Sequence, residues 1–155
     1  MKISSPVFGH NEAIPSKYTC DGENVNPSLV ISGVPPGAKS LVLIMDDPDV
    51  PRGTWVHWIL WNIKPDVSEI FEASVPPDAI EGRTSFGRPG WGGPCPPFNP
   101  DQSVGAGTHR YFFKFYALNT FLNIPPSADK AALEKAMSGA VMESAELIGL
   151  YSRSR

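Results

Sequence analysis

The sequence has few cysteines, no cluster of basic residues and no long apolar run. Only Cys20 and Cys95 occur in 155 residues, which is too few for a disulfide framework, and their spacing matches no zinc motif. We expect two partly buried thiols. A single disulfide is the less favoured alternative, because the compartment is expected to be reducing.

The shortage of basic residues limits what the protein can bind. The formal net charge is −3 at pH 7, whereas binding to nucleic acid needs clustered Lys and Arg, so no nucleic acid is expected as a partner. No apolar stretch approaches the roughly 20 residues of a membrane-spanning helix, so no membrane insertion is expected either. Residues 1–6 lack the apolar core of a signal peptide, and a cytoplasmic protein is therefore predicted.

Proline and glycine, by contrast, are abundant, with 17 and 14 residues interleaved with short apolar runs. Residues spread in this way mark turns between short strands. Strands are predicted at residues 2–8, 28–32, 40–45, 54–63 and 110–118, with a further short strand within 79–86. In the strand 54–63, strict alternation places His57 on one face with Trp55, Ile59 and Trp61, and Val56 and Trp58 on the other.

The C-terminal part has a different pattern. Leu133, Met137, Val141 and Ala145 recur at intervals of four, which predicts two short helices divided near residues 138–139, with Ser127 or Asp129 as the first cap. The chain is therefore predicted to be a single domain, residues 1–155, with a mainly β fold. We expect an antiparallel β-sandwich with short peripheral helices at its C-terminus.

Two carboxylates follow the buried strand 40–45, in the sequence Asp47-Pro48-Asp49. An ordinary turn is the simplest interpretation, since Asp and Pro are favoured in turns. Pro48 and Pro51, however, fix the backbone on both sides of Asp49. A rigid carboxylate pair at the end of a buried strand suggests a ligand site.

Two histidines and a tyrosine lie on predicted strands or at the start of one. His57 is either a core side chain with a hydrogen-bond partner or a ligand-binding group, and a neighbouring carboxylate would fix its tautomer. His109 and Tyr111 are two residues apart on a strand, so they project from one face and could reach one small ligand. Alternatively, Tyr111 belongs to the core with Phe113. Arg110 points the other way, where it could pair with a carboxylate.

A rigid loop, Gly-Gly-Pro-Cys-Pro-Pro, occupies residues 92–97. It lacks the Gly-Lys-Ser/Thr ending of a phosphate-binding P-loop. Its glycines still allow the backbone to approach a ligand, its prolines hold it still, and its N–H groups could form an anion nest. The alternative is a Pro-rich surface loop.

In their order and spacing, these motifs resemble the phosphatidylethanolamine-binding protein family, the family of the Raf kinase inhibitor proteins. The resemblance runs from about Ile3 to Tyr151, and residues 18–22 and 92–97 are similar to its bacterial and archaeal branch. It implies an antiparallel β-sandwich with peripheral helices. It also implies a pocket for phosphate or for the phosphorylated headgroup of a phospholipid.

The resemblance implies a role for each motif residue. The pocket wall would include Asp47 and His57, and Asp49 would brace the rim or a neighbouring histidine. A cis peptide bond is expected near Asp47-Pro48. The rim would be formed by Gly93, Cys95, Pro96 and Pro97, and the ligand would be hydrogen-bonded by His109 and Tyr111.

The function predicted from these observations is binding of a small anion such as phosphate, phosphoethanolamine or an acetate-like group. The role would be regulatory and non-catalytic, without cofactor or metal. The alternative is a kinase or serine-protease inhibitor that presents the long loop 87–108 to a protein partner. A metal-dependent hydrolase is less favoured, because the only candidate nucleophile, Cys95, has no evident base. Loop aromatics such as Trp91 and Phe98, expected to be exposed, leave a homodimer open.

Overall fold

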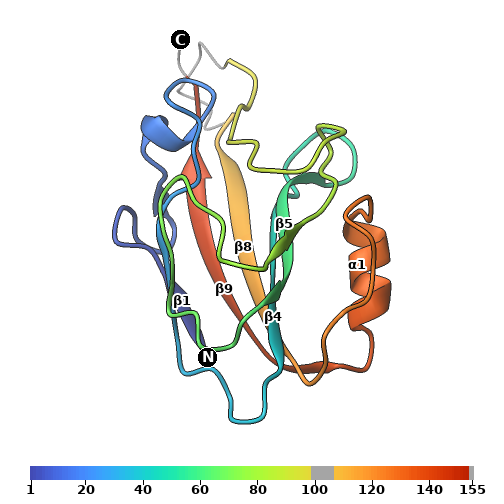
Figure 1. Cartoon of the computed structure of the whole chain (residues 1–155). Coiled ribbons are helices and arrows are strands. Elements are labelled where there is room, and N and C mark those ends of the chain that lie inside the picture. The colour runs from blue at the N-terminus through green and yellow to red at the C-terminus, as the bar shows by residue number, and fades with distance from the viewer. Residues whose placement is uncertain (99–106, 154–155) are drawn as a thin grey trace.

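The computed structural model describes residues 1–98 and 107–153. It contains a three-stranded sheet in the order β1-β3-β6 and a six-stranded sheet in the order β2-β9-β8-β4-β5-β7 (Figure 1). All strand pairs are antiparallel except β2 with β9. The elements are β1 (Lys2–Ser4), β2 (Glu12–Ala13), η1 (Ser16–Tyr18), β3 (Leu29–Ser32), β4 (Ser40–Asp47), β5 (Trp55–Ile63), β6 (Glu69–Ile70), β7 (Ile80–Glu81), β8 (His109–Leu118), α1 (Lys130–Met137) and β9 (Val141–Tyr151). The predicted mainly β sandwich is confirmed.

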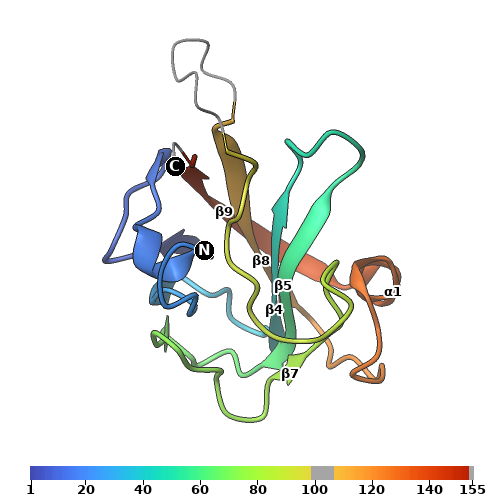
Figure 2. The same cartoon turned by 90° about the horizontal axis from the view of Figure 1, so that it is seen from above.

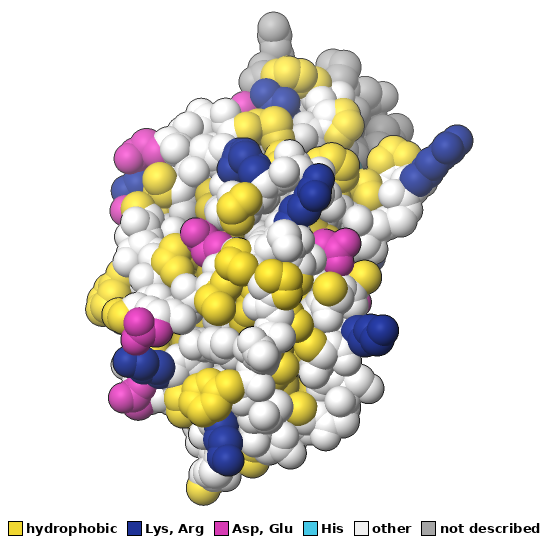
Figure 3. All heavy atoms as spheres, turned by 45° about the vertical axis from the view of Figure 1, so that its right-hand side comes forward, with side chains coloured by type: hydrophobic (Ala, Val, Ile, Leu, Met, Phe, Trp, Pro, Cys, Tyr) yellow, Lys and Arg dark blue, Asp and Glu magenta, His cyan; other side chains and the backbone are white. Residues whose placement is uncertain are grey.

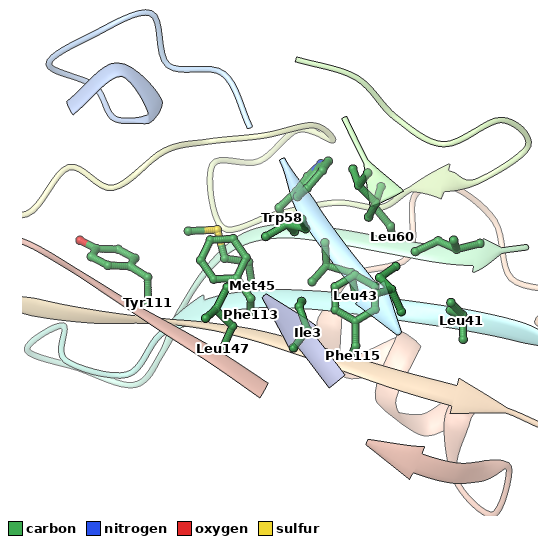
Figure 4. Packing of buried hydrophobic residues seen from close by; sticks show 14 of the residues in the cluster. Ile3, Leu41, Leu43, Met45, Trp58, Leu60, Tyr111, Phe113, Phe115 and Leu147 are labelled. Carbon is green, nitrogen blue, oxygen red and sulfur yellow. The ribbon is translucent and has the colours of Figure 1, made fainter. Parts of the chain in front are cut away.

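The main core lies between the two sheets. Side chains on one face of β4, β5 and β8 pack against Ile3, Leu29 and Ile31 of the small sheet. Figure 4 shows this packing as a row that runs from Leu41 at one end to Tyr111 at the other. Because β4 and β5 are covered on both faces, their residues are almost continuously buried.

A second core covers the opposite face of the large sheet. Leu133 and Met137 of α1 pack against Ile44 and Trp61 of the central strands, and Figure 2 shows the sheet between α1 and the N-terminal segments. Asp129 is the N-cap of α1, since its carboxylate accepts a hydrogen bond from the Ala132 N–H. None of the helices in the described part of the chain is long and apolar enough to cross a membrane.

The predicted second C-terminal helix is wrong, because residues 141–151 form β9. Gly139, at φ +80°, follows the end of α1, and the chain then pairs with β8 from Leu118–Val141 to His109–Tyr151. The interval of four between Val141 and Ala145 is a multiple of the strand period of two as well as close to one helical turn. The pattern therefore fitted both structures, and pairing with β8 decided between them.

Strict alternation along β5 is also wrong, because a bulge interrupts the strand. Met45 pairs with Trp58 while Asp46 pairs with Val56, so His57 is an extra residue on β5. Trp58 packs into the sandwich core, whereas Val56 and Ile59 pack on the α1 side. His57 therefore turns toward the sandwich side independently of Ile59.

Candidate functional site

A cavity of about 520 Å³ opens where β4 ends and where β5 and β8 begin. These strand ends lie at the upper end of the molecule in Figure 1. The lining side chains come from these three strands, from the β4–β5 loop and from two later loops. They are Asp47, Val50, Pro51, Arg52, Trp55, His57, Phe86, Cys95, Pro96, Pro97, His109 and Tyr111.

Asp47 and His109 form a buried pair at this cavity. The Nδ1 of His109 lies 2.6 Å from Oδ2 of Asp47, whose residue is only 2% exposed. Since an ionised carboxylate can only accept, His109 donates from Nδ1, and its Nε2 is left for another partner. The second carboxylate oxygen accepts from the backbone N–H of Asp49 at 2.7 Å. Both oxygens of Asp47 are therefore occupied, and the imidazole is held in one orientation.

His57 is fixed by a different partner. Its Nδ1 lies 2.6 Å from the carbonyl oxygen of Gly92, which can only accept, so Nδ1 carries the proton. Burial lowers the pKa of His57 below its usual 6.5, outweighing the opposite effects of the Gly92 carbonyl and Asp47. The ring is therefore neutral at pH 7. Its Nε2 is then a hydrogen-bond acceptor.

Tyr111 is fully buried between the two histidines. Its ring lies 5.2 Å from that of His57 in an edge contact and 6.4 Å from that of His109 in a stacked one. Burial, together with the negative charge of Asp47, raises the pKa of Tyr111 above its ordinary value. The phenol therefore keeps its proton at neutral pH and can donate it. The predicted common face of His109 and Tyr111 is confirmed, since both line the cavity.

Asp49 does not line the cavity. Its carboxylate accepts from Nε and Nη2 of Arg110 at 2.9 and 2.8 Å and from the backbone N–H of Arg110 at 2.9 Å. The Arg110 guanidinium holds the pKa of Asp49 below its usual range. The two residues join the turn after β4 to the start of β8, as expected for an arginine pointing away from Tyr111.

The rim loop contributes Cys95, Pro96 and Pro97 to the lining, but not Gly93. The Gly93 N–H donates to Oδ1 of Asn24 at 2.9 Å, and a Cβ on Gly93 would approach that oxygen to 2.3 Å. Gly93 is needed for this close packing, so it holds the rim in place from behind.

Cys20 and Cys95 form a disulfide, so the expectation of two thiols is wrong. Their Cα atoms are 5.5 Å apart across 75 residues of sequence, and the Cys20 N–H donates to the Pro94 carbonyl at 3.1 Å. The sequence spacing carries no sign of this proximity, and the expectation rested on the predicted compartment alone. The expected cis bond at Asp47-Pro48 is also wrong, because every peptide bond in the described ranges is trans.

Sequence reasoning missed several lining residues. The sequence placed Trp55 only on a strand face and Phe86 at the end of a strand, and it gave no role to Arg52. In the structure the rings of Trp55 and Phe86 meet edge-on at 5.5 Å between centroids, and each residue is 39% exposed. An exposed aromatic at a strand end was the available signal. Trp91 is half-buried against Trp58 and Phe113, contrary to expectation, and only Phe98 of the proposed dimer residues is exposed.

The geometry is that of a ligand pocket in a β-sandwich, with two oriented imidazoles and a phenol set in a mostly apolar wall. The family model described as phosphatidylethanolamine-binding protein matches residues 4–152. The chain belongs to this family.

Relatives and solved structures agree with this placement. A UPF0098 protein of Pyrococcus horikoshii, PH1269, is 52% identical over 99% of this chain and 77% of its own length. One of Methanothermobacter thermautotrophicus is 44% identical over 99% of both chains. The crystal structure of CT736 from Chlamydia trachomatis, described as a homologue of phosphatidylethanolamine-binding protein, superposes with a TM-score of 0.89 at 39% identity, covering 98% of this chain and 97% of the other. That of E. coli YbcL gives 0.87 at 30% identity, covering 97% of each. Membership supports a ligand-binding, non-catalytic role in general.

Proposed function

We propose that the pocket binds a small phosphate-bearing ligand, such as phosphate or a phosphorylated headgroup like phosphoethanolamine, without transforming it. The supporting observation is that His57, His109 and Tyr111 converge on one cavity, each oriented by a buried neighbour. Preorganised polar groups in an apolar wall favour a specific small ligand, because they are not reoriented on binding.

The hydrogen-bond donors and acceptors of the pocket determine which protonation state of the ligand binds best. Tyr111 donates, whereas the Nε2 of neutral His57 only accepts. His109 gives its Nδ1 proton to Asp47, so it donates from Nε2 only when that nitrogen also carries a proton. A phosphate group therefore binds best when it brings a proton to His57. Because a phosphate monoester loses its second proton at about pH 6, weaker binding is expected as the pH rises above about 7.

Calorimetric titration with phosphate and with phosphoethanolamine tests the proposal. The unmodified protein should bind at least one of them, and His109→Ala should abolish that binding. His10→Ala is the matched control, since His10 is exposed and its Nδ1 accepts only from the backbone N–H of Ile148. Absence of binding to the unmodified protein, or equal binding by the two variants, contradicts the proposal.

Inhibition of a kinase or serine protease through surface loops is the second candidate. Exposed Phe86 and Phe98 favour it, because they border the same cavity and its rim. Residues 99–106 of the predicted inhibitory loop lie outside the described ranges. Assay of chymotrypsin-like proteases with the protein and with Phe98→Ser tests it, and identical residual protease activity in both contradicts a role for this loop.

The metal-dependent alternative finds no ligand set, since in the described ranges no three His, Cys, Asp or Glu side chains are placed to hold one ion. Each oxygen of the Asp47 carboxylate already accepts a hydrogen bond, one from His109 and one from the Asp49 N–H.

A further inference from the structure

The lining of the pocket carries few fixed charges. Asp47 is the one carboxylate among the lining residues, and Arg52 is the one lysine or arginine. The guanidinium of Arg110 is directed to Asp49 outside the lining. Lys114 and Lys130 bind Asp46, which faces α1 on the other side of β4. These three cations are therefore paired with carboxylates, whereas Arg88 lies outside the lining, over the ring of Phe86.

Without Arg52, the pocket would be a poor place for an anion. The buried Asp47 contributes a negative charge, and burial keeps His57 neutral at pH 7. The oriented histidines and Tyr111 supply hydrogen-bonding geometry, but not a permanent positive charge. The attraction that an anion needs must then come from the mouth of the cavity.

Arg52 is placed to supply that charge. It lies on the loop between β4 and β5, is exposed, and still belongs to the lining with Pro51 and Trp55. In the part of the chain that the structure describes, its guanidinium is in no ion pair. Figure 3 shows one face of the molecule, on which Lys and Arg side chains are scattered and do not form one basic patch. A guanidinium matches phosphate in charge and in its pair of donors.

We infer that Arg52 selects the charge of the ligand, while the histidines and Tyr111 select its geometry. This inference rests on the proposed function, because it assigns the anion to the same pocket. Its consequence is that the contribution of Arg52 to affinity grows with the charge of the ligand. A phosphate monoester, a dianion above its second pKa of about 6, should depend on Arg52 more than a singly charged diester does.

The test measures dissociation constants for ethyl phosphate and diethyl phosphate at pH 8. Arg52→Gln should weaken ethyl phosphate binding about tenfold or more, and diethyl phosphate binding by a smaller factor. Arg52→Lys keeps the charge and should recover most of the affinity. Arg88→Gln is the matched control, because Arg88 lies over the Phe86 ring nearby but outside the lining; its effect should stay within about threefold.

The outcomes separate the inference from the proposed function. If the unmodified protein binds neither ester nor inorganic phosphate, the proposed function fails and the inference fails with it. If it binds and Arg52→Gln has no effect, the inference alone is wrong. Equal losses of affinity in Arg52→Gln and Arg88→Gln would mean that the overall charge of the protein, and not Arg52 itself, attracts the ligand. If Arg52→Lys does not recover the affinity, the shape of the arginine side chain matters and not its charge. Either result overturns a charge-selecting role.

Discussion

The pocket has two halves that are held in different ways. Its wall is built on β4, β5 and β8, which lie side by side in the large sheet and whose core-facing side chains are buried. Its rim, residues 92–97, belongs to no regular ladder and is held by single links. These links are the Cys20–Cys95 disulfide, the hydrogen bonds of Gly92 with His57 and of Gly93 with Asn24, and the hydrogen bond from the Cys20 N–H to the Pro94 carbonyl.

This difference assigns separate tasks to the two halves. The wall shares its stability with the whole fold, so the positions of His109 and Tyr111 can change only if the sheet changes. The rim can open locally, because its few links can break without disturbing the ladders. Ligand geometry should therefore depend on the wall, and ligand entry on the rim.

The largest effect is expected in the core behind the wall. Phe113 is fully buried and contacts Phe8 and Trp91, so Phe113→Ala should lower the free energy of unfolding by about 3–5 kcal/mol. Urea denaturation followed by tryptophan fluorescence measures this. Phe121→Ala is the control, since Phe121 is 62% exposed and its loss should change stability by only about 0.5 kcal/mol. Similar losses of unfolding free energy in Phe113→Ala and Phe121→Ala would contradict the view that the core behind the wall carries the stability of the fold.

Removing the disulfide tests the rim. The double substitution Cys20→Ser with Cys95→Ser should cost about 2–4 kcal/mol of stability, because the bond closes a long loop in the unfolded chain. Hydrogen exchange distinguishes the two halves. Amides of Cys20, Gly92 and Gly93 should lose more protection than the global change explains, whereas those of β8 should lose no more than that change. Uniform loss along the chain would mean that rim and wall open together.

The contrast between the regular strands of the wall and the non-local links of the rim also explains which features the sequence could predict. His109 and Tyr111 were correctly placed on one face because their strand is regular, and alternation along a regular strand follows from the backbone alone. The bulge at His57 depends on how β4 and β5 pair, and the disulfide joins residues 75 apart. The identity of β9 depends on the partner strand β8. These features are set by non-local contacts, which a pattern along one segment does not contain.

His57 joins the two halves, so its titration sharpens the comparison. Its folded-state pKa lies below 6.5, so the unfolded chain takes up a proton first as the pH falls. Stability should therefore decrease below about pH 6.5, with a slope of at most about 1.4 kcal/mol per pH unit from this residue. His57→Gln should flatten the profile between pH 5 and 7, whereas His10→Gln should not. Parallel profiles for the unmodified protein and His57→Gln would show that burial does not disfavour the charged ring.

The smallest effect is expected outside the pocket, at Asp49 and Arg110. The side chains are 25% and 53% exposed, so solvent screens their attraction and a double-mutant cycle of Asp49→Asn and Arg110→Gln should give a coupling below about 1 kcal/mol. Because the folded-state pKa of Asp49 is depressed, this stabilisation is present above about pH 4 and is lost as the pH falls further.

Asp49→Asn should cost more than Arg110→Gln, because the Asp49 carboxylate also accepts from the Arg110 backbone N–H. Added salt should reduce the coupling but not that difference, since only the ion pair is screened strongly. A coupling above about 2 kcal/mol that is insensitive to salt would be that of a buried pair. In that case the Asp49–Arg110 pair outside the pocket would hold the turn after β4 as firmly as the partners of Asp47 hold that residue inside the pocket. Rigidity would then not be limited to the wall built on β4, β5 and β8.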